Sequence, residues 1–244
     1  MSGELYAVAG ATISIGAAMS APAADLTAAD FAAVSWDEID GWETAGAYGD
    51  AAALITTALI NRGRDIKQKG TFNAGQMQNN FGILPTDEGQ IALKAAAKTR
   101  SNYPFKIEWD DAPPARSHAV TISQASPGVL TWAGHGVEAG DRISLATTGT
   151  LPTGLSPATT YYVKEALSAD TFSVSATNGG AAINTSSSGS GTHTATTQPT
   201  PSIDYFVALV MGATSQGGNA NTARMLQSTL EINSNIVEVT PTGA

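Results

Sequence analysis

The sequence predicts a mainly β protein with one flanking α-helix, interrupted by a small inserted all-β domain. Three observations predict this fold class. Short segments that alternate apolar and polar residues, the pattern of half-buried strands, recur along most of the 244 residues. A single Ala-rich stretch carries the start and stop signals of a helix. Residues 117–197 differ in composition from both flanks, because they hold all three histidines but only two of the twelve basic residues.

The two flanks are expected to form one discontinuous domain, residues 1–116 and 198–244, with the inserted β domain at 117–197. Prolines mark both junctions: Pro113 and Pro114 precede the insert, and Pro199 and Pro201 follow it. Within the insert, strands are predicted at 128–132, 141–147, 159–165 and 171–176. Turn signals separate them at intervals of about ten residues, which is typical of a small sandwich or barrel. An insertion of this size indicates a tolerant, outward-facing loop of the host domain.

The first flank is predicted to begin with strands and to end with the helix. Alternation predicts strands at 5–15, 34–39 and 54–60, with a short helical turn at 25–31. Residues 64–84 are expected to form a β-ribbon that bends tightly at 73–75.

The helix follows that ribbon. Thr86 is its expected N-cap, Asp87 and Glu88 lie in its first turn, and Lys94, Lys98 and Arg100 lie toward its end. A strand at 103–109 follows the helix. The second flank is predicted to be a hairpin of two long strands, 205–214 and 222–239, joined through 216–219.

Composition excludes several classes of function. The chain has 21 acidic and 12 basic residues, and its first 61 residues carry eight acids and no base, so direct binding to nucleic-acid phosphates is disfavoured. The absence of cysteine excludes disulfides, thiolate zinc sites and cysteine nucleophiles. The apolar stretch at 6–24 is not expected to be a signal peptide, because Glu4 and no basic residue precede it. No apolar run approaches the roughly 20 residues of a membrane helix.

Candidate metal ligands are sparse. His118, His135 and His193 have no metal-ligand spacing, and turn or surface positions are expected for them. The acidic run at 37–43 loosely resembles a calcium loop but lacks its alternating oxygen ligands and closing Glu. A solvated loop or an inter-subunit contact is the alternative for that run. No metal and no cofactor are therefore expected.

Catalytic motifs are also missing from the sequence. Asp110 and Asp111 form a carboxylate pair of the type used in glycoside hydrolysis, but no aromatic-rich substrate groove is evident. The four tryptophans, Trp36, Trp42, Trp109 and Trp132, are scattered, and core packing is expected for them. The chain has no nucleophile elbow, P-loop or dinucleotide-binding motif. We therefore expect that the protein is not an enzyme.

Several segments of the flanks, taken in order, resemble the tail tube (major tail) proteins of long, non-contractile-tailed bacteriophages. They are the Ala-rich opening strand, DLTAADF (25–31), NRGRDIKQKG (61–70), PTDEGQ (85–90), NYPFK (102–106) and LEINS (230–234). The insert resembles a small β module found in phage structural proteins, through GHGVEAGD (134–141), LPTGL (151–155) and TTYYV (159–163). The first resemblance spans the chain outside the insert.

The resemblance implies a β-sandwich or barrel with a flanking helix and six copies in each ring. Rings of this family stack into a hollow tube, and DNA passes through its acidic lumen without specific binding. The implied partners are further copies of the chain, the tape measure protein and the tail tip and terminator proteins. The implied location is the virion, after assembly in the bacterial cytoplasm, with no membrane insertion. The insert is expected to decorate the outside of the tube.

Trp42, Tyr48, Phe72 and Phe81 are the candidate inter-subunit contacts, on the 41–53 loop and the 64–84 ribbon. For the two phenylalanines, a place in the core is an equal alternative. Two other functions remain open. A carbohydrate-binding or adhesin protein would need an aromatic platform, for which the insert offers Trp132, Tyr161 and Tyr162. A glycan-acting enzyme would use Asp110 or Asp111.

Overall fold

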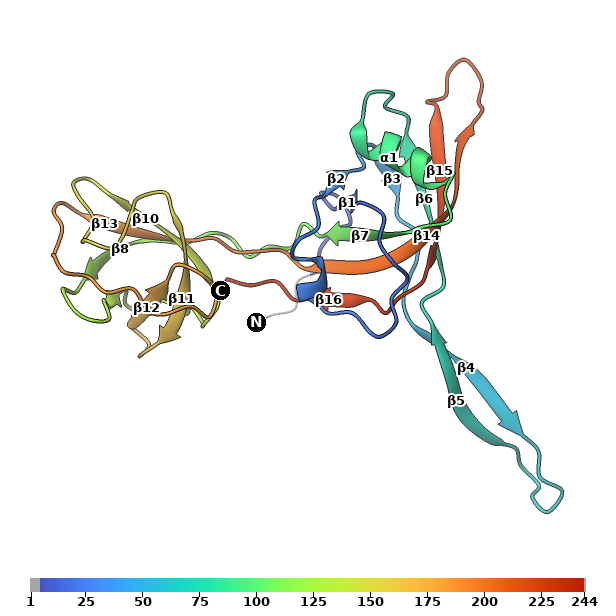
Figure 1. Cartoon of the computed structure of the whole chain (residues 1–244), viewed down its shortest axis with the longest axis horizontal. Coiled ribbons are helices and arrows are strands. Elements are labelled where there is room, and N and C mark those ends of the chain that lie inside the picture. Colours follow the sequence, from blue (N-terminus) through green and yellow to red (C-terminus); the bar gives the residue numbers. More distant parts are fainter. Residues whose placement is uncertain (1–4, 244) are drawn as a thin grey trace. The chain divides into compact units, whose positions relative to one another are not determined.

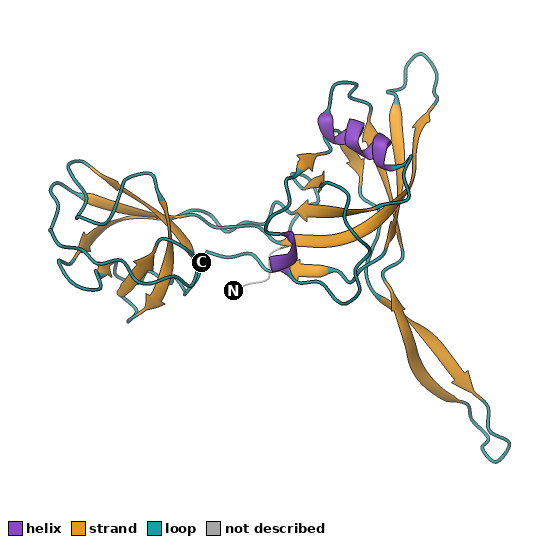
Figure 2. Ribbon diagram, in the orientation of Figure 1, coloured by secondary structure: helices purple, strands orange, loops and turns teal. Residues whose placement is uncertain are grey.

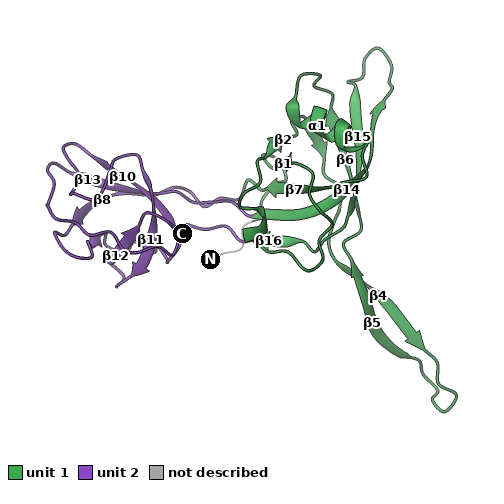
Figure 3. Cartoon of the chain, in the orientation of Figure 1, with its two compact units in different colours: residues 1–110, 203–239 green, residues 111–202, 240–244 purple. Residues whose placement is uncertain are grey.

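The computed structural model describes residues 5–243 and is mainly β, with one α-helix in that range (Figures 1 and 2). It divides into two compact units (Figure 3). The first unit comprises residues 5–110 and Ile203–Val239, and the second comprises Asp111–Ser202 and residues 240–243. The expected boundaries at 117 and 197 therefore lie a few residues inside the second unit. The C-terminal residues were also expected in the first unit, and the structure groups them with the second.

The first unit contains ten strands, a 3-10 helix and the α-helix. The strands are β1 (Thr12–Ile15), β2 (Asp37–Glu38), β3 (Trp42–Thr44), β4 (Ala51–Thr57), β5 (Ile66–Asn73), β6 (Gln76–Gly82), β7 (Asn102–Glu108), β14 (Ile203–Gln216), β15 (Met225–Ile232) and β16 (Val237–Val239). The helices are η1 (Ala28–Phe31), which lies in the helical turn predicted at 25–31, and α1 (Glu88–Ala96).

Eight of these strands form one antiparallel sheet that curls round on itself. Its order is β2-β1-β7-β14-β15-β6-β3, and β16 pairs with the start of β14. The two edge strands, β2 and β3, are joined by the three residues Ile39, Asp40 and Gly41. A connection of that length spans at most about 14 Å, so the two edges of the sheet must lie close together. We call this junction, residues 37–43, the seam.

Alternation along the strands places one face of the sheet in the core. Phe105 of β7 and Phe206 of β14 are register partners, both fully buried, and their rings stack 5.6 Å apart. Leu226 and Leu230 of β15 lie opposite Phe81 and Met77 of β6 on the same face. These side chains are buried because successive residues of a strand point to opposite faces of the sheet.

The α-helix is fixed to the seam by the fully buried side chain of Gln90. Its Nε2 donates to the carbonyl oxygens of Asp40 (2.9 Å) and Gly82 (2.7 Å), and its Oε1 accepts from the backbone N–H of Leu84. The helix is capped by Asp87, which accepts from the N–H of Gln90, and not by Thr86 as expected. Aspartate is as good an N-cap as threonine, and its negative charge interacts favourably with the helix dipole. The cap is therefore as effective at Asp87 as it would be at Thr86.

Two strand predictions in the first flank were wrong in extent, and the ribbon prediction was wrong in pairing. The opening strand begins at Thr12 and not at residue 5, and the strand expected at 34–39 shrinks to the two residues of β2. The ribbon at 64–84 does not pair with itself, because β5 pairs with β4 whereas β6 pairs with β15 and β3. The bend at 73–75 instead carries the chain from a separate hairpin into the sheet. Gly75 adopts φ +76° there, and its carbonyl accepts from Ile232.

The long strand expected at 222–239 is broken into β15 and β16. Between them, polar side chains replace the ladder of backbone hydrogen bonds. Ser234 Oγ accepts from the N–H of Val207, and the side-chain amide of Asn235 bonds to both backbone groups of Leu26. These side-chain bonds to distant backbone groups hold the chain where it turns, so that β16 returns to pair with the first residues of β14.

The second unit is a closed six-stranded barrel with the order β10-β11-β12-β9-β8-β13. Its strands are β8 (Ser117–Ile122), β9 (Leu130–Thr131), β10 (Arg142–Thr147), β11 (Thr160–Ala166), β12 (Thr171–Ser175) and β13 (His193–Thr197). Four of them match the predicted strands, whereas β8 and β13 were missed. These two strands pair with each other, so the beginning and the end of the inserted chain lie side by side.

The C-terminal residues pack within the second unit. Thr200 and Thr242 exchange two backbone hydrogen bonds of 3.0 Å, and the N–H of Gly243 donates to Asp141 Oδ1. Gly243 has φ +92°, and a Cβ there would lie 2.7 Å from the Cα of Pro199. Only glycine combines a positive φ with the absence of a Cβ, so Gly243 allows the C-terminal tail to pack against Pro199.

Candidate assembly surfaces

Among the helices and strands that the structure describes, the hairpin formed by β4 and β5 exposes the most apolar surface. These strands pair only with each other among the described strands. Leu54 is 65% exposed, Phe72 66% and Ile60, near the tip, fully exposed. An isolated two-stranded hairpin is marginally stable in water, and exposed apolar side chains of this size need a covering surface. The hairpin therefore has the properties of an element that packs against another molecule.

The sequence explains why this segment forms a hairpin. Residues 54–57 are Leu-Ile-Thr-Thr, which have high β propensity, and they lie opposite residues 66–69 in antiparallel register. A register shift between Ala52 and Leu54 marks an irregularity near the base. At the tip, the N–H of Arg62 donates to the carbonyl of Leu59 and closes the turn.

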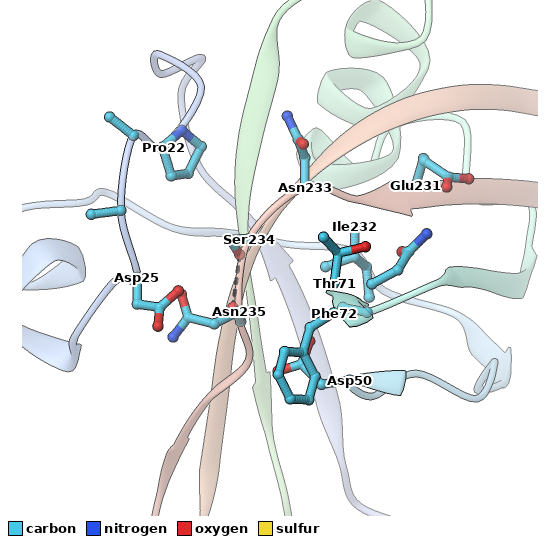
Figure 4. A pocket seen from close by; sticks show the side chains of 14 residues that line it. Pro22, Asp25, Asp50, Thr71, Phe72, Glu231, Ile232, Asn233, Ser234 and Asn235 are labelled. Atoms are coloured by element: carbon cyan, nitrogen blue, oxygen red, sulfur yellow. Dashed lines mark hydrogen bonds between the residues drawn. The ribbon is translucent and has the colours of Figure 1, made fainter. Parts of the chain in front are cut away.

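An open cleft of about 740 Å³ lies at the base of the hairpin (Figure 4). It is lined by Phe72 and by the carboxylates of Asp25, Asp50 and Glu231.

Within residues 5–243, no three acidic or histidine side chains lie close enough together to hold a metal ion. Asp37 and Glu38 of the loosely calcium-like run lie in the extended strand β2 rather than in a loop.

The four predicted contact residues are placed differently from one another. Phe72 is exposed on the hairpin, as its predicted role requires. Phe81 is 1% exposed and belongs to the sheet core, so it offers no contact surface and the alternative given for it is the correct one. Trp42 and Tyr48 are half-buried and pack against the same core.

Trp42 and Tyr48 fasten the loop that leads into the hairpin. Trp42 Nε1 donates to the side-chain oxygen of the buried Asn79, which also accepts from the N–H of Gly46. The Tyr48 hydroxyl donates to the carboxylate of Asp204, and its ring lies 5.7 Å from that of Phe206. Burial, together with this hydrogen bond, raises the pKa of Tyr48 above its ordinary value.

The outer face of the sheet carries a second distinctive surface, a band of polar side chains of which all but one are uncharged. Gln76 and Gln78 of β6 lie opposite Glu231 and Thr229 of β15, on the face away from the core. Gln76 Nε2 donates to Glu231, and Gln78 Nε2 donates to Gln76. A similar bond joins Gln216 to Gln227. We call residues 76, 78, 80, 214, 216, 227, 229 and 231 the amide face; one acid and no base belong to it. In the sequence, this face is visible as the polar residues of the alternating apolar and polar pattern in β6 and β15.

The expectation of turn or surface positions holds for one of the three histidines of the second unit, His118, whereas His135 and His193 are buried. His118 is exposed, and its ring stacks 5.4 Å from that of Trp132. His135 and His193 are 2% and 6% exposed. His135 Nδ1 accepts from the N–H of Val137, so Nε2 carries the hydrogen and donates to the carbonyl of Ser168. Hydrogen bonds inside the barrel therefore account for the burial of the His135 side chain.

The three aromatic residues considered for glycan binding do not form an exposed platform. Trp132 and Tyr161 are 5% and 4% exposed and belong to the barrel core. Tyr162 alone of the three candidates is half-exposed. Stacking on a sugar ring needs an accessible aromatic face, so two of the three candidates cannot take part.

The two aspartates considered for glycoside hydrolysis each have structural contacts. Asp111 accepts from both the N–H and the hydroxyl of Ser202. Asp110 packs closely against the backbone of Gly10, where a Cβ would lie 2.4 Å from its carboxylate oxygen. Among the tryptophans, Trp36 packs with Phe31 and Tyr205, and Trp109 donates to Asp204.

No helix within residues 5–243 combines the length and the apolar character needed to span a membrane. Comparison with known proteins adds no relationship, because no protein-family model matches the chain and a search of curated proteins finds no significant match.

Proposed function

We propose that this chain is a virion structural protein that assembles with copies of itself into stacked hexameric rings. These rings form the tail tube of a long, non-contractile-tailed bacteriophage. The observation that carries the proposal is the β4–β5 hairpin, which exposes Leu54, Ile60 and Phe72 and pairs with no other described strand. Such a hairpin is stable when it packs against a second molecule, and in a self-assembling protein that molecule is another copy of the same chain. The hexameric ring and the stacked tube are inferred from the sequence resemblance to phage tail tube proteins.

The amide face supports a role as the wall of a DNA channel. Glutamine side chains bond along β6, from β6 to Glu231 of β15, and from β14 to β15, and the amide face contains no basic residue. Lysine or arginine there would bind DNA phosphates and release counterions, and such contacts repeated along a tube would retard sliding. The wall that we propose therefore contains one acid, Glu231, and no base, and it is less acidic than the lumen that the resemblance implies.

The closed barrel of the second unit supports its role as an accessory domain. It has its own core, and its first and last strands are paired. A unit of this kind interrupts the host chain at two adjacent points and leaves the host fold intact. We assign it to the outside of the tube, because about 90 residues inside the lumen would obstruct the duplex.

Electron microscopy and sedimentation of the purified protein test the proposal. Tubes or six-fold rings are the expected result, and a protein that stays monomeric at all concentrations would contradict it. The double variant Leu54→Ser/Ile60→Ser should lower the assembled fraction by about tenfold, because the hairpin loses its apolar contact area. The matched control is Leu167→Ser, which removes an exposed leucine from the second unit and should leave assembly unchanged.

A further inference from the structure

The charges of the first unit are separated between the hairpin and the seam. The hairpin segment, residues 50–73, carries four of the twelve basic residues, Arg62, Arg64, Lys67 and Lys69, against two acids. Residues 25–43 carry six acids and no base, and four of those acids, Asp37, Glu38, Asp40 and Glu43, are the exposed carboxylates of the seam. Within residues 5–243 the one ion pair joins Lys106 to Glu108, so the hairpin cations and seam carboxylates are not paired inside the chain.

Both surfaces also combine their charges with exposed apolar side chains. On the hairpin, Lys67 and Lys69 lie opposite Thr56 and Leu54 in the β4–β5 register. Beside the seam, Gln90 ties the start of α1 to Asp40, and the exposed side chains of Leu84 and Ile91 lie on either side of that buried glutamine in the sequence. A basic hairpin with exposed apolar side chains and an acidic seam next to the helix that carries Ile91 have the complementarity that protein interfaces use to select a partner.

We infer that the β4–β5 hairpin of one copy binds the seam of a neighbouring copy. Lys67 and Lys69 face the carboxylates of the seam, and the apolar residues of the hairpin cover Leu84 and Ile91. This inference rests on the proposed self-assembly and names the surface that receives the hairpin. It also explains why the segment richest in cations lies on the element that is least covered within its own chain.

Charge reversal in the full-length protein tests the pairing. Lys67→Glu/Lys69→Glu reverses the hairpin, and Asp40→Lys/Glu43→Lys reverses the seam. All four side chains are exposed, so the thermal unfolding of each variant should match that of the parent. Each reversal alone places like charges in contact and should lower the sedimenting fraction by about tenfold or more. The quadruple variant restores opposite charges and should recover assembly, as should a 1:1 mixture of the two double variants.

The control is Lys98→Glu/Arg100→Glu, which changes the net charge equally at exposed positions after α1 and should assemble as the parent does. Assembly of the parent should weaken between about 50 mM and 500 mM salt, because added ions screen exposed charge pairs. If the parent assembles but the quadruple variant does not recover, the pairing is wrong and the proposed function stands. A parent that never assembles would instead refute the function itself.

Discussion

The hydroxyl of Tyr48 donates a hydrogen bond to the carboxylate of Asp204, across 156 residues of sequence. Trp109 Nε1 donates to the same carboxylate oxygen at 3.0 Å. Tyr48 lies in the loop between β3 and β4, and Asp204 lies near the start of β14. This pair therefore fixes the base of the exposed hairpin to the central sheet. The proposed assembly through the hairpin would benefit from such an anchor, because a freely moving hairpin would lose more conformational entropy on binding.

The Tyr48 anchor gives the protein a predictable alkaline weakness. The folded-state pKa of Tyr48 is raised by burial and by Asp204, so folding favours the neutral phenol. Its contribution is fully present below the unfolded-state pKa of about 10 and is lost progressively as the pH rises above that value. Tyr48→Phe should flatten the fall in melting temperature between about pH 9 and pH 11.

Tyr205 provides the comparison, because burial and the charge of Glu108 also raise its pKa. Tyr205→Phe should flatten the same pH profile less, because the rise in the Tyr205 pKa has no hydrogen-bonded carboxylate behind it. A Tyr48→Phe protein that keeps the full alkaline slope of the parent would show that this phenol is not the titrating group.

Gln90 should be the most sensitive polar residue of the first unit. Replacement by alanine leaves the carbonyls of Asp40 and Gly82 and the N–H of Leu84 without their side-chain partner. The expected loss in free energy of unfolding is about 2–4 kcal/mol, measured by urea denaturation. Lys94→Ala, on the same helix but half-buried, should cost under about 0.5 kcal/mol. Equal losses in the two variants would contradict the role assigned to Gln90.

Gly243→Ala should release the C-terminal tail from the second unit. The added Cβ meets the backbone of Pro199, and alanine disfavours φ +92°. The backbone hydrogen bonds between Thr200 and Thr242 should open, so hydrogen exchange at both amides should accelerate by about tenfold or more. Gly217→Ala, where a Cβ meets open space, is the control. Unchanged exchange at Thr242 would mean that the tail tolerates a side chain at this position.

The first unit should fold and assemble without the second. Glu108 of β7 and Ile203 of β14 are register partners, so a short Asn-Gly turn can join residue 110 to residue 203 in place of residues 111–202. With residues 240–244 also removed, the remaining chain should unfold cooperatively in a thermal melt and still form tubes. A shortened chain that fails to fold would show that the inserted barrel contributes to the core of its host.

Positive charge on the amide face should slow DNA release. Gln78→Lys/Thr229→Lys places two cations at paired positions of β6 and β15. Tubes should still form, whereas phage particles that carry the variant should eject DNA more slowly at low salt than at high salt. The matched control Gln78→Ser/Thr229→Ser keeps the face neutral and should eject at the parental rate. Equal rates in both variants would place the amide face away from the DNA.

The sequence by itself determined the fold class, the single helix and most strand positions, because alternation and capping are local properties that neighbouring residues express. It also located the composition break at the insert. The sequence did not determine which strands pair with each other. β5 and β6 are adjacent in sequence yet belong to different sheets, and β8 and β13 pair across more than 70 intervening residues.

Tertiary structure alone decided which side chains are available to a partner. Phe72 and Phe81 are alike in sequence and lie nine positions apart, but one is 66% exposed and the other 1%. Their difference arises because Phe81 lies opposite Leu226 in the sheet core, whereas Phe72 lies on a hairpin with no sheet beneath it. Exposure depends on what the whole chain places over a side chain, and that information is not local.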